Sequence, residues 1–431
     1  MYKRQVYCWG PRDAYLPGDG AYATTPTKVA SDPTLLDGKT IKQITDDALH
    51  TCALTGAGAA YCWGYGAQGQ LGISSFSSSD RPQPVVTSGA LSGVKLTDIT
   101  TGEYHTCAVS SAGKAYCWGS GDAGQIGDGD ARSRKAPRAV DTSGVLKGKT
   151  LVDITAGDVF TCAIDSAGKA YCWGGGFQGQ LGSGTMRASA SPVAVSKSGV
   201  LKGKTLVAID AGYSHVCALS AAGKTFCWGN NYSGELGDGS STNSAVPVAV
   251  DTSGVLSGKT FVALSAGDWA TCVVSTAGRV FCWGDGGSGQ LGDGTTAQRN
   301  TTPHAVDASG ALSGATVTAV SVGGRAVCAL SADGYPYCWG SSSSGQLGYG
   351  GYATRTRPVA VYTGGTLANA RVTQIGTGRA TWMVTKQRAA LKQTGTDSFR
   401  VAAEEGVHLS GPKLLVSTLN SVRLNRNGEI L

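Results

Sequence analysis

Six pairs of cysteines recur along the chain with the spacing C-x9-C, and these thiols are the residues best placed for chemistry. In the third pair, short runs of β-branched and aromatic residues flank 166–168, which predicts a β-hairpin with Cys162 directly opposite Cys172. Opposed residues of antiparallel strands bring their Cα atoms to about 4.5–5.5 Å, within disulfide range. We therefore predict six disulfides: Cys52–Cys62, Cys107–Cys117, Cys162–Cys172, Cys217–Cys227, Cys272–Cys282 and Cys328–Cys338.

One other use of these cysteines stays open on the sequence, and a zinc site does not fit their spacing. They could be reduced and serve as small apolar residues, whereas a zinc site would need C-x2-C spacing and a second pair of ligands. Because disulfides persist in oxidising compartments, the pairing predicts an extracellular or cell-surface protein. Cys8 is the thirteenth cysteine, and we expect it to remain a thiol or to bond to another chain.

Other motifs with possible chemistry are better interpreted as turns. The pattern G-x-G-x-x-G occurs at 64–69, 119–124, 174–179 and 284–289. No helix start and no fixed acidic residue follows it, so the context of a dinucleotide-binding loop is missing, and the motif is interpreted as a connection between repeats. Asp-Gly pairs such as Asp128-Gly129 indicate tight turns rather than calcium loops.

The histidines do not form a catalytic arrangement in the sequence. His50, His105 and His215 share one repeat position, where a repeated turn hydrogen bond is predicted. No nucleophile elbow, metalloprotease helix or credible triad is found. No cofactor and no metal are therefore predicted, and an enzyme is not expected.

A repeat of about 55 residues positions all of these motifs. The tripeptide CWG begins at Cys8, Cys62, Cys117, Cys172, Cys227, Cys282 and Cys338, and a proline keeps the same interval at Pro26, Pro82, Pro137, Pro192, Pro247, Pro303 and Pro358. Seven units follow. Each unit is interpreted as four strands A to D, which in the fourth unit are 192–195, 205–211, 216–220 and 224–228. Short strands with Gly-rich turns predict an all-β, seven-bladed β-propeller of four-stranded blades.

The propeller is predicted to occupy residues 6–386. Its last blade is closed by N- and C-terminal strands, with 6–10 beside 381–385 and Met383 opposite Cys8. Residues 1–5 are interpreted as a non-native leader, so the native N-terminus is expected to lie outside this chain. Residues 387–431 are a tail, a stalk or a truncated further domain. The predicted blades are 26–64, 82–119, 137–174, 192–229, 247–284, 303–340 and 358–386 with 6–10.

The repeats resemble those of the regulator-of-chromosome-condensation family. The resemblance rests on the GQLGDG loop, the run at 211–219 and the YCWG strand, and it covers residues 6 to about 386. It implies a seven-bladed propeller used mainly for protein binding, here a secreted, disulfide-containing member of bacterial type. The family includes a nuclear exchange factor for a small GTPase. Paired cysteines and an even period without a wedge-like insertion make small-GTPase exchange an activity that we do not expect here.

The charge and hydropathy of the chain exclude some partners. The formal net charge is +7, but residues 386–431 together with Lys3 and Arg4 carry most of it. The remaining body is nearly neutral, unlike a phosphate-binding protein, so nucleic acid is not an expected partner. No run of about 18 apolar residues predicts a membrane span.

The loops on the two faces of the predicted propeller differ in how much their residues vary from repeat to repeat. The B–C turns and D–A loops emerge on one face, which we name the variable face, and the A–B loops and C–D turns emerge on the other, the lysine face. Lys114, Lys169, Lys224 and Arg279 recur at the hairpin tips of the lysine face, which either suits an anionic polymer or is simply solvated. On the variable face the binding candidates are Glu103, Tyr104, Asp158, Tyr213, Trp269, Arg325, Arg379, Tyr65, Phe177 and Tyr232.

These observations predict an exported, non-enzymatic binding module that recognises a protein or surface glycan through the variable face. Unselected variation in loops is the competing explanation of that face. An alternative function is the adhesive or structural head of a larger cell-surface protein. A polysaccharide-acting enzyme is third, because the sequence shows no cluster of acids on one rim.

Overall fold

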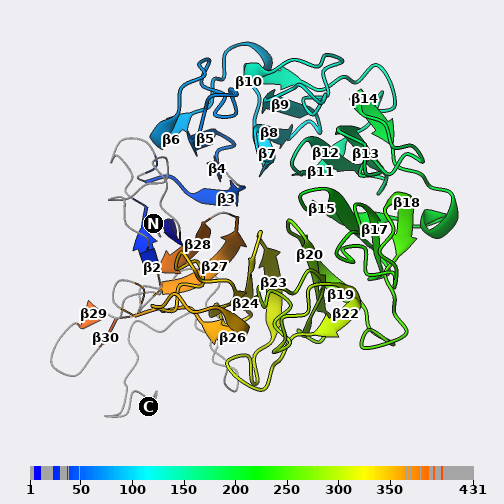
Figure 1. Cartoon of the computed structure of the whole chain (residues 1–431). Coiled ribbons are helices and arrows are strands. Elements are labelled where there is room, and N and C mark those ends of the chain that lie inside the picture. Colours follow the sequence, from blue (N-terminus) through cyan, green and yellow to red (C-terminus); the bar gives the residue numbers. More distant parts are fainter. Residues whose placement is uncertain are drawn as a thin grey trace.

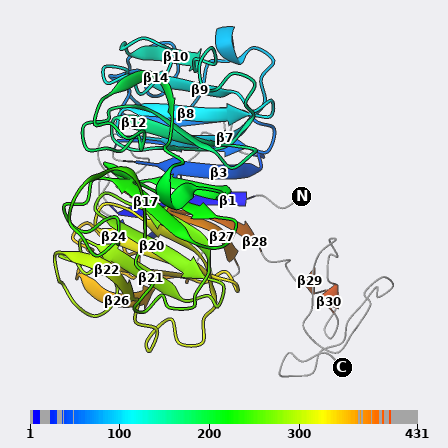
Figure 2. The same ribbon diagram turned by 90° about the vertical axis from the view of Figure 1, so that its right-hand side faces the viewer.

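Seven four-stranded antiparallel sheets form a ring around a central channel, as Figure 1 shows along the channel and Figure 2 from the side. This confirms the predicted all-β, seven-bladed propeller. Among the residues that the structure describes, the 3-10 helices η1 (Gly89–Leu91) and η2 (Gly199–Leu201) lie between blades. The computed structural model describes residues 4–10, 23–29, 36, 38–47, 49–364, 367, 370–378, 380–387, 392–393 and 399–400.

The first three blades follow one another along the chain, each with its first strand at the channel and its fourth at the outside. Blade 1 contains β3 (Ile41–Asp46), β4 (His50–Thr55), β5 (Ala60–Gly64) and β6 (Ser79–Pro84). Blade 2 contains β7 (Leu96–Thr101), β8 (His105–Ser110), β9 (Ala115–Gly119) and β10 (Arg134–Ala139). Blade 3 contains β11 (Leu151–Ala156), β12 (Phe160–Asp165), β13 (Ala170–Gly174) and β14 (Ser189–Ala194).

The next three blades repeat this order. Blade 4 contains β15 (Leu206–Ala211), β16 (His215–Ser220), β17 (Thr225–Gly229) and β18 (Ser244–Ala249). Blade 5 contains β19 (Phe261–Ala266), β20 (Ala270–Ser275), β21 (Val280–Gly284) and β22 (Asn300–Ala305). Blade 6 contains β23 (Val317–Val322), β24 (Ala326–Ser331), β25 (Pro336–Gly340) and β26 (Arg355–Ala360).

Blade 7 joins the two ends of the ring in the order β2-β1-β28-β27. Its members are β27 (Ala370–Thr377), β28 (Thr381–Gln387), β1 (Arg4–Gly10) and β2 (Ala23–Lys28). The pairing of β1 with β28 confirms closure by both termini, and β1 begins inside the segment interpreted as a leader. Two short paired strands follow, β29 (Lys392–Gln393) and β30 (Phe399–Arg400).

The predicted partner of Cys8 is wrong by one residue. Cys8 lies opposite Trp382, and Met383 lies opposite Tyr7. The register is set by Trp9 opposite Thr381, which repeats the Trp–Thr pair of the other blades, such as Trp173 opposite Thr161. Trp382 therefore occupies the place of the missing cysteine, and Cys8 lies outside the six disulfides.

The proline-containing strand belongs to the preceding blade, contrary to prediction. β14, with Pro192 as its fourth residue, pairs with β13 rather than with the sheet of β15. In each predicted blade range, the first, proline-containing strand therefore belongs to the preceding blade as its outermost strand. Proline is tolerated there because β14 is the outermost strand, whose free edge needs no ladder donor.

The central hairpin of each complete blade has the predicted register. Cys162 lies opposite Cys172, Ala163 opposite Tyr171 and Thr161 opposite Trp173. All six predicted disulfides are present, with Cα–Cα distances of 4.0 to 4.1 Å. Both half-cystines of every pair are buried, so the bridges lie inside the packed blades.

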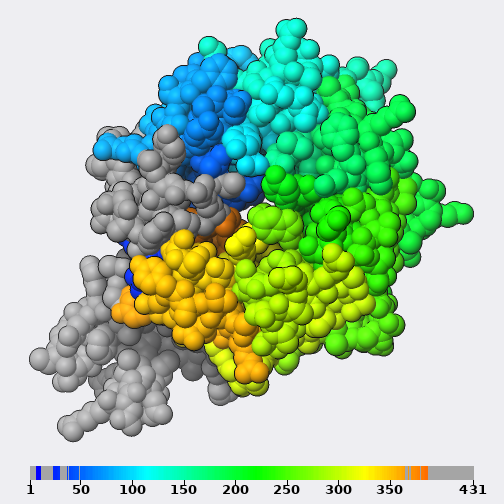
Figure 3. Space-filling view, viewed as in Figure 1, coloured from blue at the N-terminus to red at the C-terminus, as the bar shows by residue number. Residues whose placement is uncertain are grey.

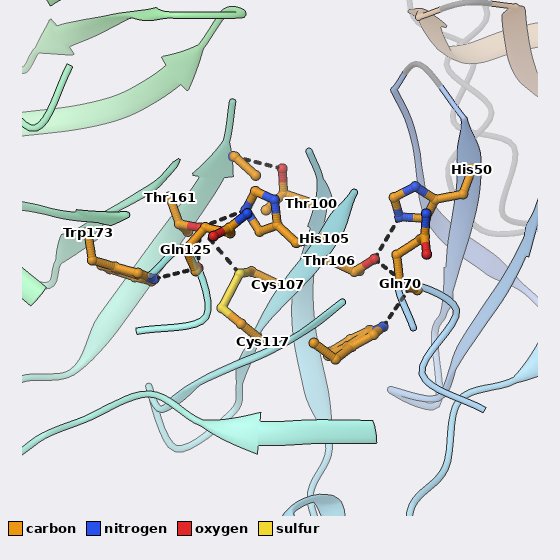
Figure 4. The surroundings of a disulfide bond; sticks show 12 residues. His50, Gln70, Thr100, His105, Thr106, Cys107, Cys117, Gln125, Thr161 and Trp173 are labelled. Atoms are coloured by element: carbon orange, nitrogen blue, oxygen red, sulfur yellow. Dashed lines mark hydrogen bonds between the residues drawn. A yellow bond between two sulfur atoms is a disulfide. The ribbon is translucent and has the colours of Figure 1, made fainter. Parts of the chain in front are cut away.

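A hydrogen-bonded relay beside several of the disulfides ties neighbouring blades together (Figure 4). Thr106 of blade 2 donates to the Gln70 carbonyl oxygen at 2.8 Å, and the Trp118 indole donates to the same oxygen at 2.9 Å. His50 Nε2 lies 2.7 Å from Thr106 Oγ1. The histidine therefore links its blade to the next one, and the predicted turn hydrogen bond is wrong for its side chain. His105 and His215 repeat the contact with Thr161 and Thr271.

Candidate binding site on the variable face

The variable-face half of the channel is a cavity of about 880 Å³, and Figure 3 shows the molecule hollowed near its centre. Its walls are the channel-lining strands and the turns that follow them. Acidic side chains dominate this lining, which would attract a cation. The charged residues of the lining are Asp46, Asp47, Asp98, Glu103, Asp153, Asp210, Asp268 and Arg325.

Three of these carboxylates connect successive blades inside the channel. Asp98 accepts a hydrogen bond from the Ile154 amide at 3.3 Å, and Asp153 accepts one from the Ile209 amide at 3.2 Å. Asp210 in turn accepts a hydrogen bond from the Ala266 amide of the next blade at 2.9 Å. Burial raises the pKa of Asp153 to about 7, and the charge of Asp98 adds to the rise. These aspartates are structural ties between successive blades.

A second acidic group lies at the mouth of the channel. Glu103, Asp158 and Asp268 come from the turns of blades 2, 3 and 5, far apart in sequence. Burial raises the pKa of Asp158 to about 7. The hydrogen bond that protonated Asp158 donates to the Glu103 carboxylate and the charge of Glu103 also contribute. Burial also raises the pKa of Asp268 to about 6, with the charge of Glu103 adding and that of Arg325 opposing. The expectation that no cluster of acids occurs on one rim is therefore wrong.

Aromatic side chains flank this acidic group. The rings of Tyr213 and Trp269 lie 6.4 Å apart, and those of Tyr65 and Tyr104 meet edge to face at 6.3 Å. The Tyr213 hydroxyl is hydrogen-bonded to Asp158, and burial together with that carboxylate raises the pKa of the phenol. The mouth thus offers apolar ring surface directly beside negative charge.

The predicted site residues divide into three groups. Glu103, Tyr213, Trp269 and Arg325 line the cavity. Tyr104, Asp158 and Tyr65 contact this group, as described above. Phe177 and Tyr232 are 73% and 72% exposed on outer loops and do not line the cavity. Arg379 lies outside the described residues.

Sequence reasoning missed the aspartates of the channel-lining strands. Asp98 and Asp153 occupy the same position of the short runs TDIT and VDIT, and Asp210 lies two positions later in the corresponding run VAID. A carboxylate repeated inside a predicted strand is an unusual use of that residue type, and it could have marked the channel wall.

The glycine loops and the cysteines show no chemistry beyond structure. A Cβ on Gly179 would lie 2.6 Å from the Ser244 carbonyl oxygen of blade 4, so the G-x-G-x-x-G loop packs against the next blade as a connector. Among the described residues, no group of three or more His, Cys, Asp or Glu side chains could hold a metal ion. In the same part of the chain, no helix is long and apolar enough to cross a membrane.

The fold and the site define a β-propeller with one loop-built, concave face. Residues 2–324 match the model of the RCC1-like domain, and residues 317–346 match that of the regulator of chromosome condensation (RCC1) repeat. The chain belongs to the RCC1-like family.

The chain is similar to two curated regulatory proteins. The chain is 31% identical to the ultraviolet-B receptor UVR8 of Arabidopsis thaliana over 334 residues, which are 77% of this chain and 72% of the receptor. It is 32% identical to the human E3 ubiquitin-protein ligase HERC2 over 277 residues, which are 63% of this chain and 6% of the ligase. Relatives of this kind support a module for protein binding.

Solved structures show the same fold at low sequence identity. Human WBSCR16 has a TM-score of 0.73 at 20% identity, with 90% of this chain and 99% of that chain covered. Yeast RCC1 (Prp20), solved bound to Kap60, has a TM-score of 0.74 at 18% identity, with 90% of each chain covered. Binding of Prp20p from Saccharomyces cerevisiae to Gsp1p and histones is described with another structure. These structural similarities do not support our expectation that the chain lacks small-GTPase exchange activity. That expectation stays a prediction.

Proposed function

We propose that this protein is an exported, non-enzymatic module that binds a partner protein through the mouth of its channel. The observation that carries the proposal is the convergence of Glu103, Asp158 and Asp268 beside the Tyr213–Trp269 pair. Such a mouth suits a segment that presents a lysine or arginine side chain. A surface glycan is the other partner class that the variable face could accept.

A cationic side chain would relieve the repulsion between these carboxylates. Burial and like charges hold the pKa of Asp158 and Asp268 above the ordinary range, so ionisation of the empty mouth is disfavoured. A guanidinium or ammonium group entering the mouth would offset that cost and could also lie over an aromatic ring. Tyr, Trp and Arg are also the residue types that dominate the binding energy of protein interfaces.

The same geometry argues against the enzyme alternative. The two carboxyl groups of a typical glycosidase lie about 5–5.5 Å apart in retaining enzymes and about 6.5–9.5 Å apart in inverting ones, with the scissile bond between them. Glu103 and Asp158 are hydrogen-bonded to each other, so the substrate cannot lie between them. We therefore favour recognition over hydrolysis at this mouth.

Export is supported by the six buried disulfides, because such bonds persist in oxidising compartments. In the described residues each disulfide lies within one blade, so it can form without pairing distant parts of the chain. A cell-surface or secreted location follows as part of the proposal.

Selection of peptides from a random displayed library against the folded, oxidised chain tests the proposal. We expect selected peptides to contain Lys or Arg and to lose at least tenfold in affinity to the variant Tyr104→Ala, Tyr213→Ala, Trp269→Ala. Tyr335→Ala is the control, because Tyr335 is 49% exposed on the lysine face. Selected peptides that bind the triple variant as tightly as the wild type would refute the choice of the mouth.

A further inference from the structure

The lysine face of blades 2 to 5 carries a large excess of positive charge. Its loops and hairpin tips cover 85–95, 110–114, 140–150, 165–169, 195–205, 220–224, 250–260 and 275–279. Their acidic residues are Asp141, Asp165 and Asp251. Their basic residues are Lys95, Lys114, Lys147, Lys149, Lys169, Lys197, Lys202, Lys204, Lys224, Lys259 and Arg279.

Backbone contacts bring these segments together around the ring. The Ser166 amide at a hairpin tip donates to the Thr150 carbonyl oxygen at 2.8 Å, and the Leu206 amide donates to the Gly168 carbonyl oxygen at 3.1 Å. At the next tip, the Lys224 ammonium donates to the Lys259 carbonyl oxygen at 3.0 Å. Each tip therefore lies against the loop that enters the following blade, so the segments that carry these cations form an arc from blade to blade.

Three lysines of blade 3 come from segments that backbone hydrogen bonds bring together. The Ser166 amide donates to the Thr150 carbonyl oxygen at 2.8 Å, and the Val195 amide donates to the Ala170 carbonyl oxygen at 3.0 Å. Lys149 precedes β11, Lys169 is at the hairpin tip and Lys197 follows β14. Burial lowers the pKa of Lys197, and contact with Lys169 and the charge of Lys149 lower it further. Asp165 is the acid that opposes them. We name Lys149, Lys169 and Lys197 the blade-3 cluster.

The cations of the arc far outnumber the carboxylates of this face. Within the described residues, the ion pairs involve Arg134, Arg138, His304 and Arg357, none of which belongs to the arc. The acids of this face cap their own turns: Asp141 and Asp251 each accept a backbone hydrogen bond at 2.8 Å from the serine two residues on. The positive potential of the arc is therefore largely uncompensated.

We propose that this arc binds a linear anionic polysaccharide, with the blade-3 cluster as its strongest contact. The arc repeats once per blade, so successive tips meet successive charges of an extended chain. Its loops contain no aromatic residue on which nucleic-acid bases could stack. Six disulfides indicate a compartment where acidic polysaccharides, rather than nucleic acids, are the available polymers. The acidic channel mouth on the opposite face repels such a polymer, so it binds one face only.

Fluorescence anisotropy with labelled polygalacturonate oligosaccharide tests this inference on the oxidised, full-length chain. We expect Lys149→Gln, Lys169→Gln, Lys197→Gln to weaken binding at least tenfold at low salt. The magnitude of the slope of log K against log salt should decrease by about two. The variant lacks three cations, so its binding releases up to three fewer counterions from the polymer. The control Arg132→Gln, Lys135→Gln, Arg187→Gln removes the same charge from exposed residues of the variable face and should change affinity less than twofold.

Three results would overturn the inference. One is an equal loss of affinity in both triple variants, and another is binding of neutral dextran as tight as that of polygalacturonate. The third is tighter binding of duplex DNA or of anionic phospholipid vesicles, which would assign the arc to another partner class. Mass spectrometry and thermal unfolding confirm that each variant keeps its disulfides and fold. The variant Tyr104→Ala, Tyr213→Ala, Trp269→Ala should retain polygalacturonate binding, so failure here and failure of the proposed channel-mouth function are distinguishable.

Discussion

Asp158 shows how a single side chain records the convergence of three blades. Burial and its contact with Glu103 raise its pKa from 3.8 to about 7. A carboxyl with a raised folded-state pKa binds its proton more tightly in the native protein, so stability is lost as pH rises from the unfolded value through the folded one. The unfolding free energy of the wild type should therefore fall between about pH 5 and pH 8, whereas Asp158→Asn should not show this loss. We expect the unfolding free energy of Asp158→Asn minus that of wild type to be about 1–2 kcal/mol larger at pH 8 than at pH 5, after allowance for solvent screening. Denaturant titrations at both pH values measure this difference.

Asp251→Asn is the matched control for that experiment. Hydrogen bonds from Ser253 lower the pKa of Asp251, so its contribution is complete above pH 4 or so and is lost only in stronger acid. This variant should therefore differ from wild type by the same amount at both pH values. If Asp158→Asn behaved like Asp251→Asn, the carboxyl group of Asp158 would not be held beside Glu103.

At the scale of elements, one glycine per connector determines how closely neighbouring blades pack. Gly182 has a φ of +62°, and a Cβ there would lie 2.8 Å from the Trp228 indole nitrogen. Gly184 has a φ of +90°, but its Cβ would find no atom nearer than 3.9 Å. Both Gly→Ala changes carry backbone strain, whereas only Gly182→Ala also displaces a buried tryptophan. We expect Gly182→Ala to cost about 1–3 kcal/mol more than Gly184→Ala in chemical unfolding, and equal costs would contradict this role.

The hairpins were predictable from the sequence, but the outer strands were not. Within 161–173, the turn position and the alternation of residue types fix a register that is local, and the structure has it residue for residue. The strand of Pro192 can pair with the hairpin before it or with the sheet after it, and both choices satisfy the same repeat. The structure pairs it with the hairpin before it, a choice that the local sequence of the strand does not specify.

At the scale of the whole molecule, a net charge of +7 conceals two faces of opposite character. Glu103, Asp158 and Asp268 are separated by about one or two repeats each, and only closure of the ring turns their loops toward one mouth. Sequence analysis identified Glu103 and Asp158 as individual candidates, because variation between repeats is visible in a sequence. The distances between blades are not, so the acid cluster required the structure.

The ring is closed without a covalent link, and the register of blade 7 shows where one could be added. Cys8 lies opposite Trp382 in the position that disulfides occupy in the other blades, such as Cys162 opposite Cys172. We expect Trp382→Cys to form a disulfide with Cys8, detected as the loss of two hydrogens in intact mass. Since the new loop encloses most of the chain, the variant should be more stable than Trp382→Ala, which creates a similar cavity, by at least about 4 kcal/mol in the chain-entropy model. Met383→Cys faces Tyr7 and should form no such bond, so a link from position 383 but not from 382 would show that the register is wrong.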